Sequence, residues 1–149
     1  MIEFPQDFKE FLQLLNLKKI EYLVIGGYAV GYHGYPRATG DLDIWISINE
    51  INASKIVDVM RAFGFNLPEL DKKIFLTEKK VIRMGVPPMR LEILTSIDGV
   101  SFAECYKNRV IANIDNIPVN FISKTDLLQN KRSSARPQDL VDADRLKNK

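Results

Sequence analysis

The chain has 149 residues, of which 46% are hydrophobic and 27% are charged, and its formal net charge is +2. This size favours one domain over residues 1–149 with a hydrophobic core of its own, and the composition excludes an intrinsically disordered chain. The single cysteine, Cys105, excludes an internal disulfide scaffold. Acidic residues are in slight excess in the first half and basic residues in the second, which suits a site that holds a cation and a polyanion together.

The N-terminal segment MIEFPQDFKEFLQLL contains acids, a proline and no long apolar run, so it does not resemble a secretory signal. No stretch of the sequence approaches the ~18 consecutive apolar residues of a membrane-spanning helix. We therefore expect a cytoplasmic protein with no membrane partner. The weak positive charge also argues against an extended nucleic-acid footprint.

Hydrophobic periodicity and turn residues predict alternating helices and strands, followed by several strands and two final helices. The predicted helices span 4–16, 27–34, 53–63, 123 or 125 to about 134, and 137–147. The predicted strands span 21–25, 42–48, 74–76, 80–84, 90–95, 108–113 and 117–121. Residues 84–89 are predicted to form a turn. This order predicts an α/β (α+β) fold in which helices flank a mixed sheet.

Two consecutive glycines, Gly26 and Gly27, lie between a predicted buried strand and a predicted helix. Glycine at such a junction allows a sharp turn and a close approach of the backbone to a ligand. The amides at the start of the helix would then point outward, as an anion site requires. The pair is also compatible with a plain tight turn.

The segment Asp41-Leu42-Asp43-Ile44-Trp45-Ile46 places two acids one residue apart in a predicted strand. Because side chains alternate along a strand, we expect both carboxylates on one face and the apolar residues between them on the other. Neighbouring carboxylates repel each other, and a Mg²⁺ ion shared with substrate phosphates would relieve that repulsion. An Asp-x-Asp pair alone also occurs in loops that bind no metal.

A third acid, Glu92, lies inside the apolar strand predicted at 90–95. A carboxylate in such surroundings is costly unless it is paired or bound to a metal. The same pattern is compatible with an exposed residue of a half-solvated strand.

In combination these features resemble the nucleotidyltransferase superfamily, which has the DNA polymerase β-like fold. The resemblance rests on Gly26-Gly27-Tyr28-Ala29-Val30, on Arg37-Ala38-Thr39-Gly40-Asp41-Leu42-Asp43-Ile44 and on Glu92. The segment 131–142, KRSSARPQDLVD, is similar to the ending of small bacterial and archaeal nucleotidyltransferases of the abortive-infection and toxin–antitoxin type. There a Lys precedes an Arg-x-x-Asp-x-x-Asp helix; Gln138 departs from this pattern, since a Lys is common at its position.

The resemblance implies three catalytic metal ligands, Asp41, Asp43 and Glu92, that hold one or two Mg²⁺ (or Mn²⁺) ions. Glu92 would be a ligand or a general base. The resemblance also implies five nucleotide-binding residues: Gly26, Gly27, Arg37, Thr39 and Lys131. The glycine amides would contact phosphates, Lys131 or Arg37 would counter phosphate charge, with Lys131 preferred, and Thr39 would orient Asp41 or bind phosphate.

The implied reaction is transfer of a nucleoside monophosphate from a nucleoside triphosphate such as ATP to an acceptor hydroxyl. The acceptor stays open between a tRNA end, a protein side chain and a small hydroxylated molecule. A P-loop is excluded because Tyr32 and His33 stand where it needs Lys-Ser/Thr. The alternative from another class is a catalytically silent domain of this fold that serves as an interaction module or a toxin–antitoxin partner.

Overall fold

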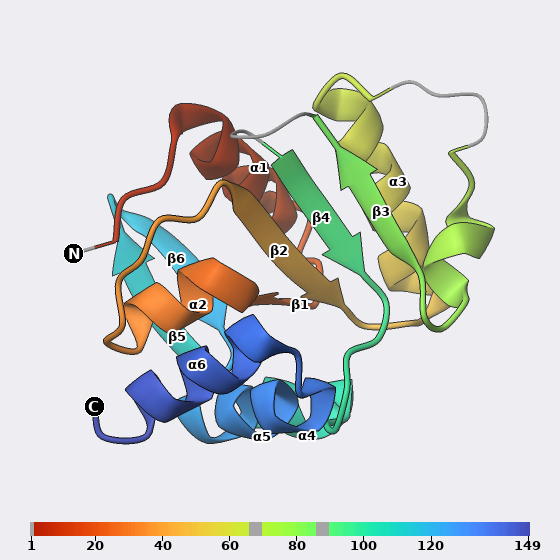
Figure 1. Cartoon of the computed structure of the whole chain (residues 1–149). Coiled ribbons are helices and arrows are strands. Elements are labelled where there is room, and N and C mark those ends of the chain that lie inside the picture. Colours follow the sequence, from red (N-terminus) through yellow and green to blue (C-terminus); the bar gives the residue numbers. More distant parts are fainter. Residues whose placement is uncertain (1, 66–69, 86–89) are drawn as a thin grey trace.

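The computed structural model describes residues 2–65, 70–85 and 90–149 (Figure 1). Within these ranges the chain forms six α-helices, one 3₁₀ helix and six strands. The helices are α1 (Gln6–Leu17), α2 (Gly26–Tyr32), α3 (Glu50–Ala62), η1 (Lys72–Leu76, the 3₁₀ helix), α4 (Phe102–Lys107), α5 (Lys124–Ser134) and α6 (Pro137–Leu146). The strands are β1 (Tyr22–Ile25), β2 (Asp41–Ile46), β3 (Val81–Met84), β4 (Arg90–Leu94), β5 (Val110–Ile114) and β6 (Ile117–Phe121).

The six strands form one mixed sheet in the order β3-β4-β2-β1-β6-β5. Strand β2 pairs parallel with β4 and antiparallel with β1, and β1 pairs parallel with β6. The two edges are antiparallel hairpin-like pairs, β3 with β4 and β5 with β6. The predicted mixed sheet flanked by helices is therefore confirmed.

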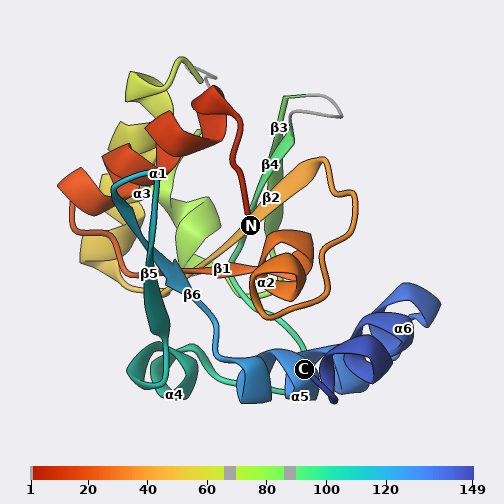
Figure 2. The same cartoon turned by 90° about the vertical axis from the view of Figure 1, so that its left-hand side faces the viewer.

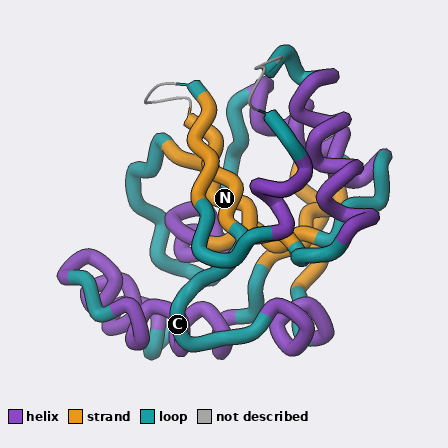
Figure 3. The backbone as a smooth tube through the Cα atoms, turned by 90° about the vertical axis from the view of Figure 1, so that its right-hand side faces the viewer, coloured by secondary structure: helices purple, strands orange, loops and turns teal. Residues whose placement is uncertain are grey.

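The helices occupy three places around the sheet. Helices α1 and α3 lie together on one side of it and α2 lies on the other, whereas α4, α5 and α6 form a row along the lower part of the molecule (Figures 1 and 2). Figure 3 shows the same row from the opposite direction, beneath the strands. Among the described residues, no helix is both long and apolar enough to pass through a lipid bilayer.

Alternation along β2 and β4 separates a buried apolar face from a polar one. Leu42, Ile44 and Ile93 have no exposed surface, and Leu91 is only 3% exposed. They lie on the face away from α2, where helix α1 contributes the core residues Phe8, Phe11, Leu12 and Leu15. Burial of these side chains, each contributing about 1.5–3 kcal/mol, holds the strands that carry the acids.

One local prediction is wrong and one helix is missed. The strand predicted at 74–76 is the 3₁₀ helix η1, whose first turn is capped by the Asp71 side chain accepting a hydrogen bond from the Lys73 amide. Helix α4 was not predicted, because six residues with one buried side chain, Cys105, are too few to show a helical period. Of the turn predicted at 84–89, residues 86–89 lie outside the described part of the chain.

Candidate active site

The twin glycines form the junction between β1 and α2, and each is pressed against a predicted site residue. Gly26 has a φ of +67°, and a Cβ atom there would lie 2.1 Å from Oδ2 of Asp43. A Cβ on Gly27 would lie 2.6 Å from Oγ1 of Thr39. Glycine is required at position 26 both by the backbone conformation and by the close approach of the carboxylate.

Parallel pairing of β2 with β4 brings the third acid beside the first two. In this register Asp43 is opposite Glu92, and Asp41 is opposite Arg90. Residues opposite each other on paired strands carry their side chains on the same face, so the carboxyl groups of Asp43 and Glu92 are neighbours. Oδ1 of Asp43 is buried and has no hydrogen-bond partner among the residues that the structure describes. The three predicted acids therefore converge, and one of their oxygens is left without a protein partner.

The surroundings of Asp43 oppose its ionisation. Burial and the negative charges of the neighbouring Glu92 and Asp41 raise the pKa of Asp43 to about 8, and the positive charge of Lys131 only partly offsets them. At neutral pH Asp43 therefore retains a proton while no cation is bound. A carboxyl group in this state is typical of sites where several acids must later share a positive charge.

Two arginines that were not predicted face the acids. Nε of Arg83 lies 3.0 Å from Oε1 of Glu92, and Nη2 of Arg90 lies 2.8 Å from Oδ2 of Asp41. The same Arg90 nitrogen lies 3.4 Å from Oε1 of Glu92. A signal for Arg90 exists in the sequence, because it precedes Glu92 by two residues and so shares its strand face. Arg83 depends on the pairing of β3 with β4, for which the sequence has no signal.

A cavity of about 660 Å³ opens between the sheet, the start of α2 and helices α5 and α6. Its lining includes all eight residues that the sequence predicts for the site: Gly26, Gly27, Arg37, Thr39, Asp41, Asp43, Glu92 and Lys131. The structure thus brings together residues that are up to 105 positions apart. Their individual roles stay predictions.

The two cations predicted to meet phosphate are already paired with buried carboxylates. Nζ of Lys131 lies 2.9 Å from Asp139 and 3.3 Å from Asp142. Arg37 donates two hydrogen bonds of 3.0 Å to Asp142, whose side chain has no exposed surface. These bonds join α5, α6 and the segment before β2 into one wall of the cavity. Arg136, with 76% of its side chain exposed, is the more accessible cation on this wall.

Asp139 shows the reverse of the environment around Asp43. Burial would raise the pKa of Asp139, but hydrogen bonds from Ser134, Lys131 and Arg136 outweigh it and hold that pKa at about 2. Asp139 is therefore a carboxylate at any physiological pH. Its negative charge is neutralised locally, so this group serves to hold α5 and α6 together.

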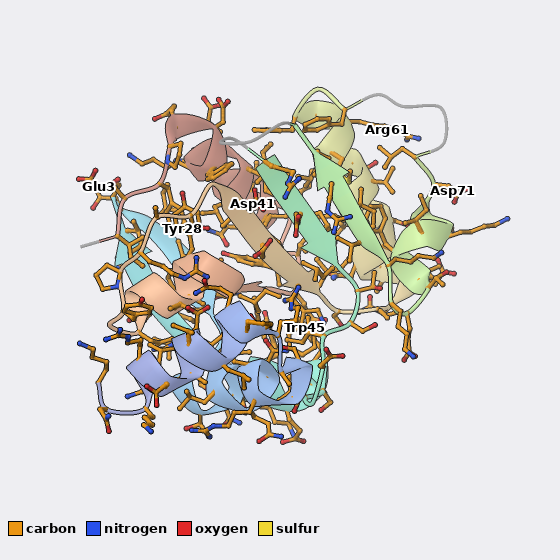
Figure 4. All side chains as sticks on the ribbon, in the orientation of Figure 1. Glu3, Tyr28, Asp41, Trp45, Arg61 and Asp71 are labelled. Atoms are coloured by element: carbon orange, nitrogen blue, oxygen red, sulfur yellow. The ribbon has the colours of Figure 1, made fainter. Side chains whose placement is uncertain are left out.

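Thr39 and Trp45 lie at the two ends of the acidic strand face. The Thr39 hydroxyl donates to the backbone carbonyl of Asp41 at 3.4 Å, and not to its carboxylate. Trp45, which is labelled in Figure 4, is 2% exposed. It packs edge-on against Phe102, so it is a packing residue. The acids are thus framed by a hydroxyl before the strand and by apolar packing at its end.

The donor set can be tested for its fit to a divalent cation. Within the described ranges, no group of three acidic, histidine or cysteine side chains is arranged to hold one metal ion, and Asp41 is bound to Arg90. Asp43 and Glu92, however, are neighbours on one strand face of the cavity, and the buried Oδ1 of Asp43 has no hydrogen-bond partner among the described residues. Carboxylate oxygens are the ligands that Mg²⁺ prefers, so the chemistry of the site fits such an ion once Asp41 is released.

Comparison with known proteins relates the chain to others through its structure. No family model and no curated protein sequence matches the chain. A crystal structure described as an antigenic nucleotidyltransferase-like protein from Paracoccidioides brasiliensis matches with a TM-score of 0.56 and 15% identity, over 93% of this chain and 71% of that one. A Thermotoga maritima protein provisionally described as a nucleotidyltransferase matches with a TM-score of 0.59 and 13% identity, over 95% of this chain and 88% of that one.

These likenesses define the class of the fold. The chain has a nucleotidyltransferase-like fold, as its motifs predicted. At identities of 13–15% the likeness establishes the architecture and not the reaction.

Proposed function

We propose that the protein is a metal-dependent nucleotidyltransferase that uses a nucleoside triphosphate and modifies a hydroxyl group of an acceptor. One observation carries this proposal. Asp41, Asp43 and Glu92 come from two neighbouring parallel strands and face one cavity beside the Gly26 turn. A fold shared with nucleotidyltransferase-like proteins supports it.

In the proposed reaction the acceptor oxygen forms a bond to the α-phosphorus of the triphosphate. The bond from that phosphorus to the oxygen bridging to the β-phosphate breaks, and pyrophosphate leaves with the bonding electrons. The proton of the acceptor hydroxyl passes to the Glu92 carboxylate, if that group is the general base, or otherwise to solvent water. Such transfers depend on positioning and on stabilisation of charge more than on covalent chemistry by the protein.

The residues of the chain divide these tasks. Asp41, Asp43 and Glu92 would hold Mg²⁺ or Mn²⁺, which when bound stabilises the negative charge that develops on the phosphates and the leaving group. Gly26 leaves room for the Asp43 carboxylate next to the start of α2. Asp43 must give up its proton to become a ligand, so the site is loaded more readily at higher pH.

A silent interaction module of the same fold is the second candidate, and the two arginines favour it. Arg83 and Arg90 already neutralise Glu92 and Asp41 without a metal. If these pairs were permanent, the cavity would carry no cation and no triphosphate. A thermal shift assay with Mg²⁺ and each nucleoside triphosphate distinguishes the candidates, because only a nucleotide-binding protein gains stability.

The direct test is incubation with each α-³²P-labelled nucleoside triphosphate, Mg²⁺ and a cell extract, followed by separation of labelled RNA, protein and small molecules. We expect label in one acceptor class, and a loss of at least 100-fold in the Asp43→Asn variant. Asp58→Asn, at an exposed position of α3, is the matched control and should retain full activity. Equal labelling by the wild type and Asp43→Asn would refute the assignment of the site.

A further inference from the structure

Arg90 is placed where a cation between the first and third acids would be. It begins β4 directly opposite Asp41, and its backbone amide donates to the carbonyl of Gly40 at 3.4 Å. One nitrogen, Nη2, lies 2.8 Å from Asp41 and 3.4 Å from Glu92. A single positive group therefore bridges two of the three acids that the proposed function assigns to a metal.

The guanidinium is attracted by the acidic site as a whole. Its hydrogen bond to Asp41 and the negative charges of Asp41, Glu92 and Asp43 raise the pKa of Arg90 above its ordinary value. Arginine is protonated at any physiological pH, so this positive charge is permanent and compensates part of the repulsion among the three acids. Loss of this charge would leave the acids without a counterion at that position.

The hold on Arg90 is nevertheless weaker than that on Arg37. Arg37 makes two bonds of 3.0 Å to one carboxylate that has no exposed surface. Arg90 reaches Asp41 and Glu92 through the single nitrogen Nη2, the Asp41 side chain is 30% exposed, and the buried Nε of Arg90 has no hydrogen-bond partner among the described residues. A partly exposed side chain that is held through one nitrogen can change rotamer without movement of the strand.

From this geometry we propose that Arg90 is a built-in counterion that keeps divalent metal out of the site until a nucleoside triphosphate arrives with it. This inference rests on the proposed function and names the species that the site accepts, a metal–triphosphate complex in preference to a free metal ion. Arg90 is a positioning and specificity residue.

Electrostatics explains both halves of the inference. A guanidinium and a divalent cation repel each other and compete for the same oxygens of Asp41 and Glu92, so metal alone must displace Arg90 without compensation. A triphosphate supplies new negative oxygens next to the displaced side chain, and the planar fork of arginine is well suited to bind them. Metal and triphosphate therefore bind with positive coupling.

The test measures Mn²⁺ binding from the electron paramagnetic resonance signal of the free ion, first without nucleotide. Arg90→Gln should bind Mn²⁺ at least 10-fold more tightly than the wild type. Arg132→Gln, an exposed arginine of α5 outside the cavity, is the matched control and should stay within twofold of the wild type. Equal affinity of Arg90→Gln and the wild type for Mn²⁺ alone would overturn the inference.

A second titration uses Mn²⁺ together with a non-hydrolysable ATP analogue. Here the advantage of Arg90→Gln should disappear, because the variant has lost its contact to the triphosphate; an undiminished 10-fold advantage would refute the triphosphate contact. Arg90→Met replaces the glutamine variant if circular dichroism shows that the latter is not folded. Absence of Mn²⁺ binding in every protein, with and without the analogue, would instead refute the proposed function itself.

Discussion

Asp43 on β2, which is half-buried, and Asp139 on α6, which is buried, line the same cavity, but their carboxyl groups are in opposite electrostatic states. Burial and two neighbouring acids raise the pKa of Asp43 to about 8, whereas around Asp139 a hydroxyl, an ammonium and a guanidinium outweigh burial and hold its pKa at about 2. Too little positive charge surrounds the Asp43 carboxyl group, whereas the charge of the Asp139 carboxylate is neutralised by its partners. A site prepared for a cation and a structural ion cluster thus differ in their partners, not in their residue types.

The largest effect is expected from removing Lys131, the cation shared by Asp139 and Asp142 in the ion cluster. Lys131→Met would leave Asp139 and Asp142 buried without their shared ammonium group, and we expect a loss of about 3–5 kcal/mol in the free energy of unfolding. Urea denaturation measures this loss. Lys147→Met removes an exposed ion pair with Asp144 and should cost less than about 1 kcal/mol.

The Lys131→Met variant also distinguishes between two roles of Lys131. If it acts only within the ion cluster, the activity of the folded fraction should be unchanged at low temperature. A drop in activity per folded molecule, with a raised KM for the triphosphate, would support the phosphate contact that the sequence predicts.

The next test replaces Asp43 and Asp139 separately by asparagine and compares the sign of the change in the free energy of unfolding. Asp139→Asn should destabilise the protein by about 2 kcal/mol at pH 7, because a folded-state pKa below the unfolded value contributes stability above pH 4. Asp43→Asn should stabilise it at pH 8, because a raised pKa costs stability progressively as the pH rises from about 4 to about 8.

Chemical denaturation at pH 5 and pH 8 checks both signs. The benefit of Asp43→Asn should be smaller at pH 5, where Asp43 is protonated in the folded protein and costs little. Destabilisation by Asp43→Asn at both pH values would show that Asp43 is a matched structural group like Asp139.

The smallest expected effect concerns the contact between Gly26 and Asp43. Gly26→Ala places a Cβ in a left-handed backbone conformation and against the carboxylate, whereas Gly64→Ala, with a φ of +106°, has nothing within 4 Å of its new Cβ. In both variants the backbone strain lowers the free energy of unfolding by about 1–3 kcal/mol. The excess for Gly26→Ala, about 1 kcal/mol in thermal denaturation, measures the contact, and equal losses would show that Asp43 moves away freely.

Local features of this fold follow from the sequence more directly than its long-range pairings do. The strand that ends at Ile25, the glycine junction and the shared face of Asp41 and Asp43 depend on neighbours a few residues apart, and each was predictable from alternation and turn residues. The three-residue apolar run at Ile74 was misassigned to a strand, because nothing in so short a run shows that Phe75 would be buried from a 3₁₀ turn.

The arrangement of the site required pairings that one sequence does not reveal. The position of Glu92 opposite Asp43 depends on the pairing of β2 with β4, which are separated along the chain by residues 47–89, including α3 and β3. The role of Lys131 in the ion cluster likewise depends on the packing of α6, and the pairing of Arg37 with Asp142 joins residues 105 positions apart. Resemblance to a family indicated that these residues belong together, but not which of them neutralise one another.

The alternation of β2 and β4 has a consequence for how mutations far from the cavity would act. Sliding β4 past β2 by a single residue would exchange the two faces of the strand, so that Leu91 and Ile93 would enter the cavity and Glu92 the hydrophobic interior. The buried apolar face of these strands therefore fixes their register, and the register sets the positions of the charged side chains on the opposite face. Substitutions that weaken the packing of this face, such as Ile44→Ala, would make the relative positions of Asp41, Asp43 and Glu92 less well defined, although no charged residue is changed.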